Sequence, residues 1–123
     1  MPDIWRIYRI KNCYHTHPHK DKFIVIVCRD AEYMGFLVNS TINHYVLDRP
    51  YLLKCQVMLR ESDYGFLSHD SYLDCGQIYS FKDGELVVGL ELIHDKTKAE
   101  IKTAVSASKT IAKRYKDLIL SNH

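Results

Sequence analysis

The sequence predicts a small, mainly β domain of the α+β class, in which one C-terminal helix packs on an SH3-like barrel or strongly bent antiparallel sheet. Six short segments with strand character, separated by turn residues, occupy the chain up to about residue 92. A single segment with helical spacing follows them. The 123 residues suffice for one hydrophobic core, and no repeat or linker divides them. We therefore expect a single domain over residues 1–123.

The first three predicted strands lie in the N-terminal third of the chain. Residues Ile4–Ile10 alternate in polarity and carry large apolar side chains, as a half-buried strand does. Residues Lys22–Arg29 are apolar throughout their interior, which is typical of a strand buried on both faces. Residues Gly35–Ser40 form the third predicted strand. A polar loop, Lys11–Asp21, and a turn, Asp30–Met34, connect the three.

Three more strands are predicted before residue 93. Residues Ile42–Tyr51 read as an exposed loop, and apolar residues alternate with polar ones over Leu53–Leu59. Residues Ser71–Phe81 form the fifth predicted strand. Lys82-Asp83-Gly84 is typical of a hairpin turn, so we expect a sixth strand over Glu85–Leu92.

The hydrophobic period then changes from two residues to that of a helix. Thr97-Lys98-Ala99-Glu100 matches a capping box, in which the Thr and Glu side chains bond free backbone amides at a helix start. Residues at helical spacing follow it: Ile101, Val105, Ser108, Ala112, Tyr115 and Ile119. We expect one amphipathic helix over about residues 98–120.

The charge distribution is more informative than the net charge of +2, which is too small to indicate a nucleic-acid partner. Residues 98–117 hold six basic and two acidic side chains, whereas the rest of the chain holds 11 and 13. The C-terminal helix therefore carries a basic stripe. A solvated helix face and a surface that contacts RNA or a partner both explain it.

The N-terminus and the cysteines indicate the compartment. Met1-Pro2-Asp3 has no basic segment followed by an apolar one, and the longest apolar run, Phe23–Cys28, is too short to span a membrane. We therefore expect a cytoplasmic protein without a membrane partner. The four cysteines are dispersed and form no Cys-x-x-Cys pair, which favours buried free thiols: Cys13, Cys28, Cys55 and Cys75.

Basic and hydroxyl side chains occur at the ends of two neighbouring predicted strands. Lys22 begins the second strand, directly after His19-Lys20-Asp21, and Ser40-Thr41 end the third strand. Strands hold such side chains at fixed positions, and ammonium and hydroxyl groups are suitable donors to an anion. This arrangement predicts a phosphate site. An ordinary strand-end lysine and strand-ending hydroxyls are the alternative.

Three short segments resemble the MazF/PemK toxins, which share an SH3-like barrel with the CcdB toxins. Pro2-Asp3-Ile4-Trp5 is similar to the family's opening Gly-Asp-Ile/Leu, and Lys20–Val27 is similar to its Lys-x-Arg-Pro followed by an apolar strand. His69–Ile78 resembles the family's Asp-Ser, apolar strand and Gln-Ile/Leu. Together with the C-terminal helix, the resemblance covers roughly residues 2–81. It departs from the family at one catalytic position, where Lys22 replaces the family's arginine and lacks its bidentate guanidinium.

The resemblance implies a toxin of a toxin–antitoxin pair that cleaves single-stranded RNA without a metal or other cofactor. It also implies a homodimer and an antitoxin whose disordered tail binds the active-site groove. In metal-free cleavage, Lys22 would stabilise charge on phosphorus or donate a proton, and Ser40 or Thr41 would bond a phosphate oxygen. His19 would act as the base, and Lys20 would clamp the phosphate.

Nine tyrosines suggest base stacking, which RNA-binding proteins use. Tyr14, Tyr45 and Tyr51 lie in predicted loops and are the RNA-binding candidates. Tyrosines within the predicted strands are more often core residues with an exposed hydroxyl. Asp70-Ser71 is a further candidate pair, although a turn at a strand start also explains it.

Two alternative functions remain open. The Lys-for-Arg departure favours a non-catalytic protein of the same fold, either a CcdB-like protein-binding toxin or an adaptor. The other alternative is a metalloenzyme, because Cys13, His15, His17 and His19 alternate along one extended segment and are possible zinc ligands. Neighbouring residues of an extended chain do not easily surround a tetrahedral ion, so a solvated His-rich loop is the preferred reading.

Overall fold

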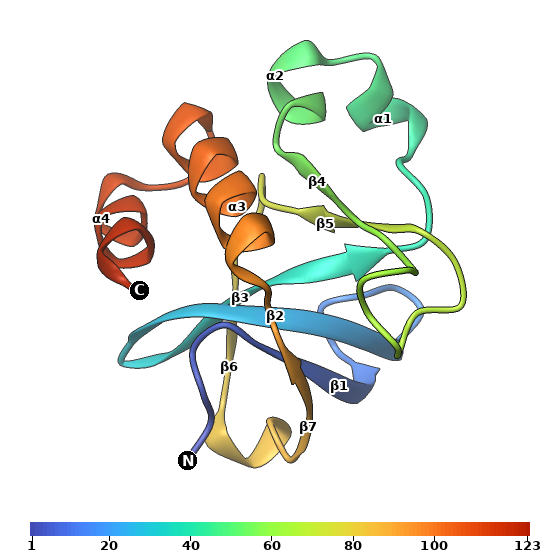
Figure 1. Ribbon diagram of the computed structural model, residues 1–123, viewed down its shortest axis with the longest axis vertical. Coiled ribbons are helices and arrows are strands. Elements are labelled where there is room, and N and C mark those ends of the chain that lie inside the picture. The colour runs from blue at the N-terminus through green and yellow to red at the C-terminus, as the bar shows by residue number, and fades with distance from the viewer.

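The computed structural model, which describes all residues 1–123, is a curled antiparallel sheet with helices on one side (Figure 1). This confirms the predicted fold class. The strands are β1 (Arg6–Cys13), β2 (Lys20–Asp30), β3 (Glu32–Asn39), β4 (Gln56–Leu59), β5 (Ser71–Asp74), β6 (Tyr79–Phe81) and β7 (Val88–Leu92). The helices are α1 (His44–Leu47), α2 (Pro50–Leu53), α3 (Asp95–Ala107) and α4 (Lys113–Ser121), with a 3₁₀ turn, η1, over Asp83–Glu85.

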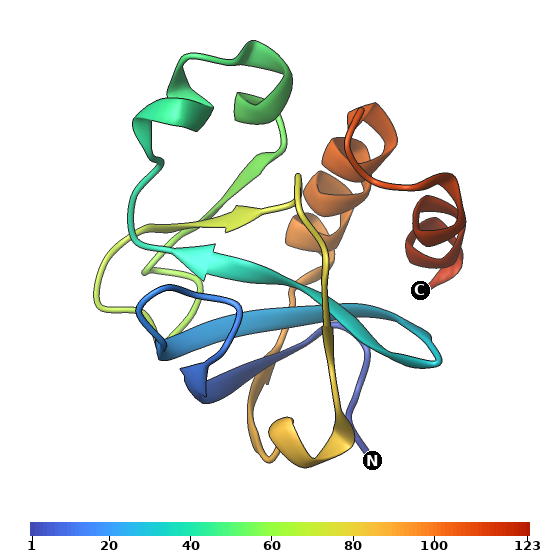
Figure 2. The same cartoon turned by 180° about the vertical axis from the view of Figure 1, so that it is seen from behind.

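The strands are ordered β4-β5-β3-β2-β1-β7, and β6 makes a second pairing with β3. The end strands β4 and β7 do not pair with each other, so the sheet is a curled half-barrel rather than a closed barrel. Seen from behind, β6 runs steeply across the twisted β2–β3 ribbon (Figure 2). A Cβ on Gly35 would lie 2.5 Å from the Val25 carbonyl oxygen, so this close approach of β3 to β2 requires glycine.

The curled sheet separates two hydrophobic clusters. The larger cluster lies between the sheet and helices α3 and α4, and includes Val25 and Ile101. The smaller one lies on the other face and includes Ile24, Ile26 and Phe81. The interior of β2 is thus buried on both faces, as its continuous apolar sequence predicts. All four cysteines are buried and free, which confirms that prediction.

The N-terminal strand boundaries differ from the prediction. The first strand begins at Arg6 rather than Ile4 and extends to Cys13, so the predicted loop Lys11–Asp21 is shorter. The turn between β2 and β3 consists of Ala31 alone, with φ of 60°, rather than residues 30–34. Backbone pairing of β1 with β2 and of β2 with β3 continues into polar residues next to the turns. The strands are therefore longer than their alternation of apolar and polar residues indicates.

The middle of the chain contains three further corrections. The predicted loop Ile42–Tyr51 forms the short helices α1 and α2, so β4 starts at Gln56 rather than Leu53. The predicted strand Ser71–Phe81 is divided into β5 and β6, which pair with opposite ends of β3. The segment Lys82–Gly84 is no hairpin turn, because β6 pairs with β3 while the shorter β7 pairs with β1.

The predicted single helix over residues 98–120 is two helices, α3 and α4. The chain turns at Ser108, whose hydroxyl accepts a hydrogen bond from the Thr110 amide, and Thr110 Oγ1 donates to the Gly76 carbonyl oxygen at 2.6 Å. The capping box is also wrong, because α3 begins at Asp95. Thr97 is buried, and its Oγ1 accepts a 2.8 Å hydrogen bond from the Tyr64 hydroxyl.

No helix of the protein has both the length and the apolar character needed to cross a membrane.

Candidate functional site

The ammonium group of Lys22 is held between two strands at one end of the sheet. Lys22 lies near the start of β2, opposite Ile10 of β1. Its Nζ donates a 2.7 Å hydrogen bond to Oδ1 of Asn39, the last residue of β3. The half-buried side chain is thereby fixed in direction, while two of its three ammonium protons remain free for another acceptor.

The surroundings of Lys22 lower the pKa of its ammonium group. Burial is the main cause, because it penalises the charged form, and the nearby charge of Lys20 adds to it. The lowered pKa makes proton donation easier than from an exposed lysine. An anion bound at this position would be attracted by a partly desolvated cation, which is a stronger interaction than one in open solvent.

Two adjoining pockets open beside Lys22, and both are also lined by Lys20 and Ser40. The first, of about 250 Å³, is called the aromatic pocket and is completed by Asp21, Phe23, Val38, Phe66, Leu67, Ser68, His69 and Ser71. The second, of about 240 Å³, is called the amide pocket and is completed by Asn39, Thr41, Ile42, Asn43, Val46, Gln56 and Asp74. The shared residues place cations and a hydroxyl where the two pockets meet.

The aromatic pocket combines an aromatic surface with polar groups. Phe23 and Phe66 meet edge to face, with 4.7 Å between ring centroids, and both are half-buried against the large core cluster. Ser68 and His69 are exposed at the same pocket, and Ser71 is buried. Such a pocket offers a stacking surface and hydrogen-bonding groups beside a cation, which suits a nucleotide.

Three carboxamide side chains line the amide pocket: Asn39, Asn43 and Gln56. Gln56 Nε2 donates to Asp74 Oδ1 at 3.0 Å, and the Gly76 amide donates to the same oxygen. Asn43, which follows Thr41 and Ile42, caps the start of α1, because its Oδ1 accepts a hydrogen bond from the Val46 amide. The Asp74 carboxylate is thus engaged in hydrogen bonds.

The structure places Lys20, Lys22, Ser40 and Thr41 together, but not the remaining candidates. His19 is exposed and packs near His17, and it lines neither pocket. The ring of Tyr45 is exposed on α1, beneath the Arg49 guanidinium, and Tyr51 is exposed on α2. The catalytic role of His19 as the base and RNA binding by the three loop tyrosines stay predictions.

Tyr14 lies in a different electrostatic setting from Lys22. Its ring packs on His15, with 4.2 Å between centroids, and His15 in turn packs on Tyr79. Burial raises the pKa of the Tyr14 hydroxyl, and the negative charges of Glu85 and Glu32 raise it further. These acidic neighbours repel a phosphate backbone, so the structure separates Tyr14 from the cationic pockets.

The basic stripe of the C-terminal segment is partly neutralised. Lys113 forms an ion pair with Asp117, and Arg114 forms one with Asp30 of β2. No residue of α3 or α4 lines the two pockets beside Lys22. The stripe is therefore separate from the candidate site.

Sequence reasoning missed Asn39, Phe66 and His69. Asn39 could have been found, because it directly precedes Ser40 at the end of the same strand. Phe66 and His69 lie in an irregular loop before β5, far from Lys22 in sequence, and only the folding of this loop against β2 brings them to the pocket. No local pattern indicates that contact.

The histidine-rich segment does not form a metal cluster. Nowhere in the chain do three His, Cys, Asp or Glu side chains come together in a way that could hold a metal ion. Cys13 is buried in the smaller core cluster, and His15 Nε2 is 2.9 Å from the carbonyl oxygen of Ser80. His17 and His19 lie near each other and are exposed.

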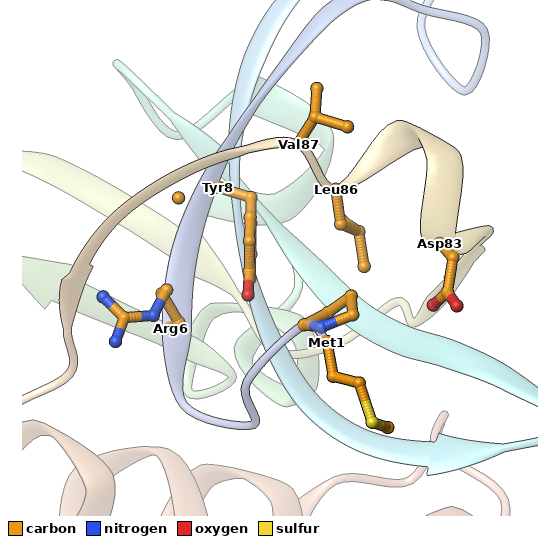
Figure 3. A pocket seen from close by; sticks show the side chains of 8 residues that line it. Met1, Arg6, Tyr8, Asp83, Leu86 and Val87 are labelled. Atoms are coloured by element: carbon orange, nitrogen blue, oxygen red, sulfur yellow. The ribbon is translucent and has the colours of Figure 1, made fainter.

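The largest hollow, of about 620 Å³, lies elsewhere. Met1, Tyr8, Leu86 and neighbouring side chains surround it, between the start of β1 and η1 (Figure 3). Its one basic side chain, Arg6, is already paired with Asp3 at 2.8 Å. This hollow therefore presents no free cation comparable to Lys22.

The curled half-barrel with its C-terminal helices is the fold of the MazF-type toxins, as the resemblance implied. The chain is similar to a mycobacterial endoribonuclease solved in complex with its cognate antitoxin, with 19% identity and a TM-score of 0.64, over 91% of this chain and 98% of that chain. It is also similar to the Mycobacterium tuberculosis toxin MazF-mt6, with 12% identity and a TM-score of 0.60, over 83% of this chain and 94% of that chain.

Sequence comparison adds no closer assignment. No protein-family model matches the chain, and no curated protein matches it by sequence.

Proposed function

We propose that the protein is the toxin of a toxin–antitoxin pair and a metal-independent endoribonuclease that cleaves single-stranded RNA. The observation that carries this proposal is the convergence of Lys22, Lys20 and Ser40 on two adjoining pockets, one of which has an aromatic surface. The fold likeness to an endoribonuclease and to a MazF toxin supports it.

The geometry suits RNA more closely than a generic anion. A phosphate at the junction of the pockets would meet the free ammonium protons of Lys22 and the hydroxyl of Ser40. The adjoining nucleobase would then reach Phe23 and Phe66, and stacking on such rings requires an unpaired base. A phosphate next to an unpaired base is a feature of single-stranded RNA.

The chemistry requires no ion in this proposal. During cleavage the 2′-oxygen attacks phosphorus and charge develops on the phosphate oxygens. Lys22, held by Asn39 and partly desolvated, would stabilise that charge, with Ser40 or Thr41 as a further donor. The lowered pKa of Lys22 also suits it to protonate the leaving 5′-oxygen.

The partners follow from the same proposal. A second copy of the chain would form a homodimer, and an antitoxin with an acidic or disordered tail would occupy the cationic pockets. The solved complex of the similar endoribonuclease with its cognate antitoxin supports the second partner. An RNA-cleaving toxin of this kind would act in the cytoplasm.

Induced expression in bacteria tests the function, with growth and RNA integrity as the measurements. The parent should arrest growth and cleave RNA, whereas Lys22→Ala should do neither. Lys109→Ala, which removes an exposed lysine between α3 and α4, is the matched control and should behave like the parent. A parent that leaves growth and RNA unchanged would favour the non-catalytic, protein-binding alternative.

A further inference from the structure

The aromatic pocket contains a group that can accept a proton, as RNA cleavage requires. A base must remove the proton of the 2′-OH before or during attack on phosphorus. Besides serine hydroxyls, the polar lining groups are Lys20, Lys22, Asp21 and His69. The ammonium groups of the two lysines are donors without a lone pair to accept a proton, so Asp21 and His69 are the two groups to compare.

Asp21 is poorly suited to this role because both of its oxygens are engaged. Oδ1 accepts a 3.0 Å hydrogen bond from the Asn12 amide, and Oδ2 accepts one of 2.9 Å from Arg9. The Asn12 amide, followed by the Arg9 guanidinium, holds the pKa of Asp21 below its usual range. A carboxylate with a lowered pKa and a hydrogen bond to each oxygen is a weak base.

The hydrogen bonds of His69 define its tautomer. Its Nδ1 is 2.9 Å from the carbonyl oxygen of Asp70, and a carbonyl oxygen can only accept. Nδ1 therefore carries the proton, which leaves the lone pair of the neutral ring on Nε2. The Ser71 hydroxyl donates to the His69 carbonyl oxygen at 3.2 Å and supports the same loop geometry. The imidazole is exposed and can be reached by a substrate.

We propose that His69 is the general base of the reaction, with Nε2 as the accepting atom; this inference rests on the proposed endoribonuclease function. Nε2 takes the proton of the 2′-OH, and the 2′-oxygen forms a bond to phosphorus. The bond from phosphorus to the 5′-oxygen breaks, and that oxygen takes a proton from the Lys22 ammonium. The products are a 2′,3′-cyclic phosphate and a 5′-hydroxyl, and water returns both side chains to their starting protonation states.

Several charged groups surround His69 and can influence the pH dependence of cleavage. Lys20, Asp21 and Lys22 line the pocket from β2, and Asp70 adjoins the ring from its own loop, where its carboxylate accepts from the Glu61 amide. A protonated imidazole has no lone pair on Nε2, so only the neutral ring can act as the base. Cleavage should therefore fall as the pH is lowered, because protonation removes the accepting lone pair.

The test measures single-turnover cleavage of a long unstructured RNA transcript from pH 5 to 9. His69→Gln should slow cleavage at pH 7 by about a hundredfold or more, the scale of a lost general base, and should remove the rise with pH. His123→Gln, at the exposed C-terminus, is the matched control and should keep the parent rate and profile. Binding of a 2′-O-methyl oligonucleotide that spans the main cleavage site should stay within about twofold in His69→Gln, because a general base acts on the chemical step rather than on binding.

Each other outcome contradicts the assignment. If His69→Gln keeps the pH dependence, or His19→Gln removes it instead, another residue is the base. If His69→Gln weakens binding of the 2′-O-methyl oligonucleotide as much as it slows cleavage, His69 binds RNA and is not the base. A parent that cleaves no RNA at any pH refutes the proposed function, whereas an active parent beside an equally active His69→Gln refutes this inference alone.

Discussion

The Lys22 ammonium donates to Asn39 Oδ1 at 2.7 Å, and this bond joins the start of β2 to the last residue of β3. It aims a half-buried cation at the junction of the two pockets, which Ser40 and Lys20 also line. A neutral carboxamide is well suited to this position, because it accepts the hydrogen bond without cancelling the positive charge.

The first prediction concerns the charge of that partner. Asn39→Asp should lower RNA cleavage by about tenfold or more, because a carboxylate beside Lys22 neutralises its attraction for phosphate. Ser106→Asp adds the same charge on an exposed position of α3 and should leave the rate unchanged. Cleavage rates at one salt concentration measure both, and equal losses in the two variants would mean that only net charge matters.

Lys22 itself gives a second prediction, on substitution chemistry. Lys22→Ala should slow cleavage by about a hundredfold or more, as the loss of one preorganised electrostatic group does. Lys22→Arg keeps the charge but does not give up its proton, so its cleavage rate should lie between those of Lys22→Ala and the parent. Single-turnover rates of the three proteins measure this order. An arginine variant as active as the parent would show that Lys22 acts through its charge alone and does not protonate the leaving oxygen.

The lowered pKa of Lys22 predicts how stability depends on pH. Because the folded state disfavours the charged amine, the unfolded state binds more protons between the lowered folded pKa and the ordinary value of 10.5. The parent should therefore gain unfolding free energy relative to Lys22→Met as pH rises from 7 toward 10. Urea denaturation of both proteins across this range measures the difference. If the difference in unfolding free energy between the parent and Lys22→Met stays constant or shrinks as the pH rises, the pKa of Lys22 is not lowered.

Stacking in the aromatic pocket can be tested at Phe66. Phe66→Leu keeps apolar volume against Phe23 but removes the ring, so oligonucleotide binding should weaken by about fivefold to a hundredfold, the range expected for one stacked base. Val87→Ala, at an exposed apolar position that lines neither pocket, serves as the control. Fluorescence anisotropy with a 2′-O-methyl oligonucleotide measures the affinity, and an unchanged value would remove Phe66 from the RNA site.

Metal removal distinguishes the endoribonuclease from the metalloenzyme alternative. Treatment with EDTA should leave the melting temperature and the cleavage rate unchanged, because no three potential ligands converge in the structure. Elemental analysis of the purified protein checks the same point independently. One zinc per chain, with a loss of stability in EDTA, would support a site in the histidine-rich segment.

The buried hydroxyl of Tyr64 predicts a stability effect away from the pockets. It donates to Thr97 Oγ1 at 2.8 Å and accepts from the His94 amide at 3.1 Å, where α3 begins. Tyr64→Phe leaves these partners unsatisfied and should lower the free energy of unfolding by about 1–3 kcal/mol. Chemical denaturation measures it. Tyr51→Phe, at a partly exposed tyrosine on α2, should have almost no effect.

The fold class, the two-sided burial of β2 and the free cysteines were predictable from the sequence. These features depend on the local spacing of apolar residues, which a single chain displays directly. The sequence also placed Lys22 within two residues of the start of β2, which is Lys20, and Ser40 within one residue of the end of β3, which is Asn39. The division of the C-terminal segment into α3 and α4 was not predictable, since it depends on the bond from Thr110 to distant Gly76.

The completion of the site depends on contacts between segments that are distant in sequence. The division of residues 71–81 into β5 and β6 reflects their pairing with opposite ends of β3, which no local periodicity encodes. The same curling brings Phe66 and His69 of an irregular loop to the pocket of Lys22, and leaves Tyr14 among acidic residues. Contacts between segments distant in sequence depend on strand order and sheet curvature, so they follow from the whole fold rather than from any one segment.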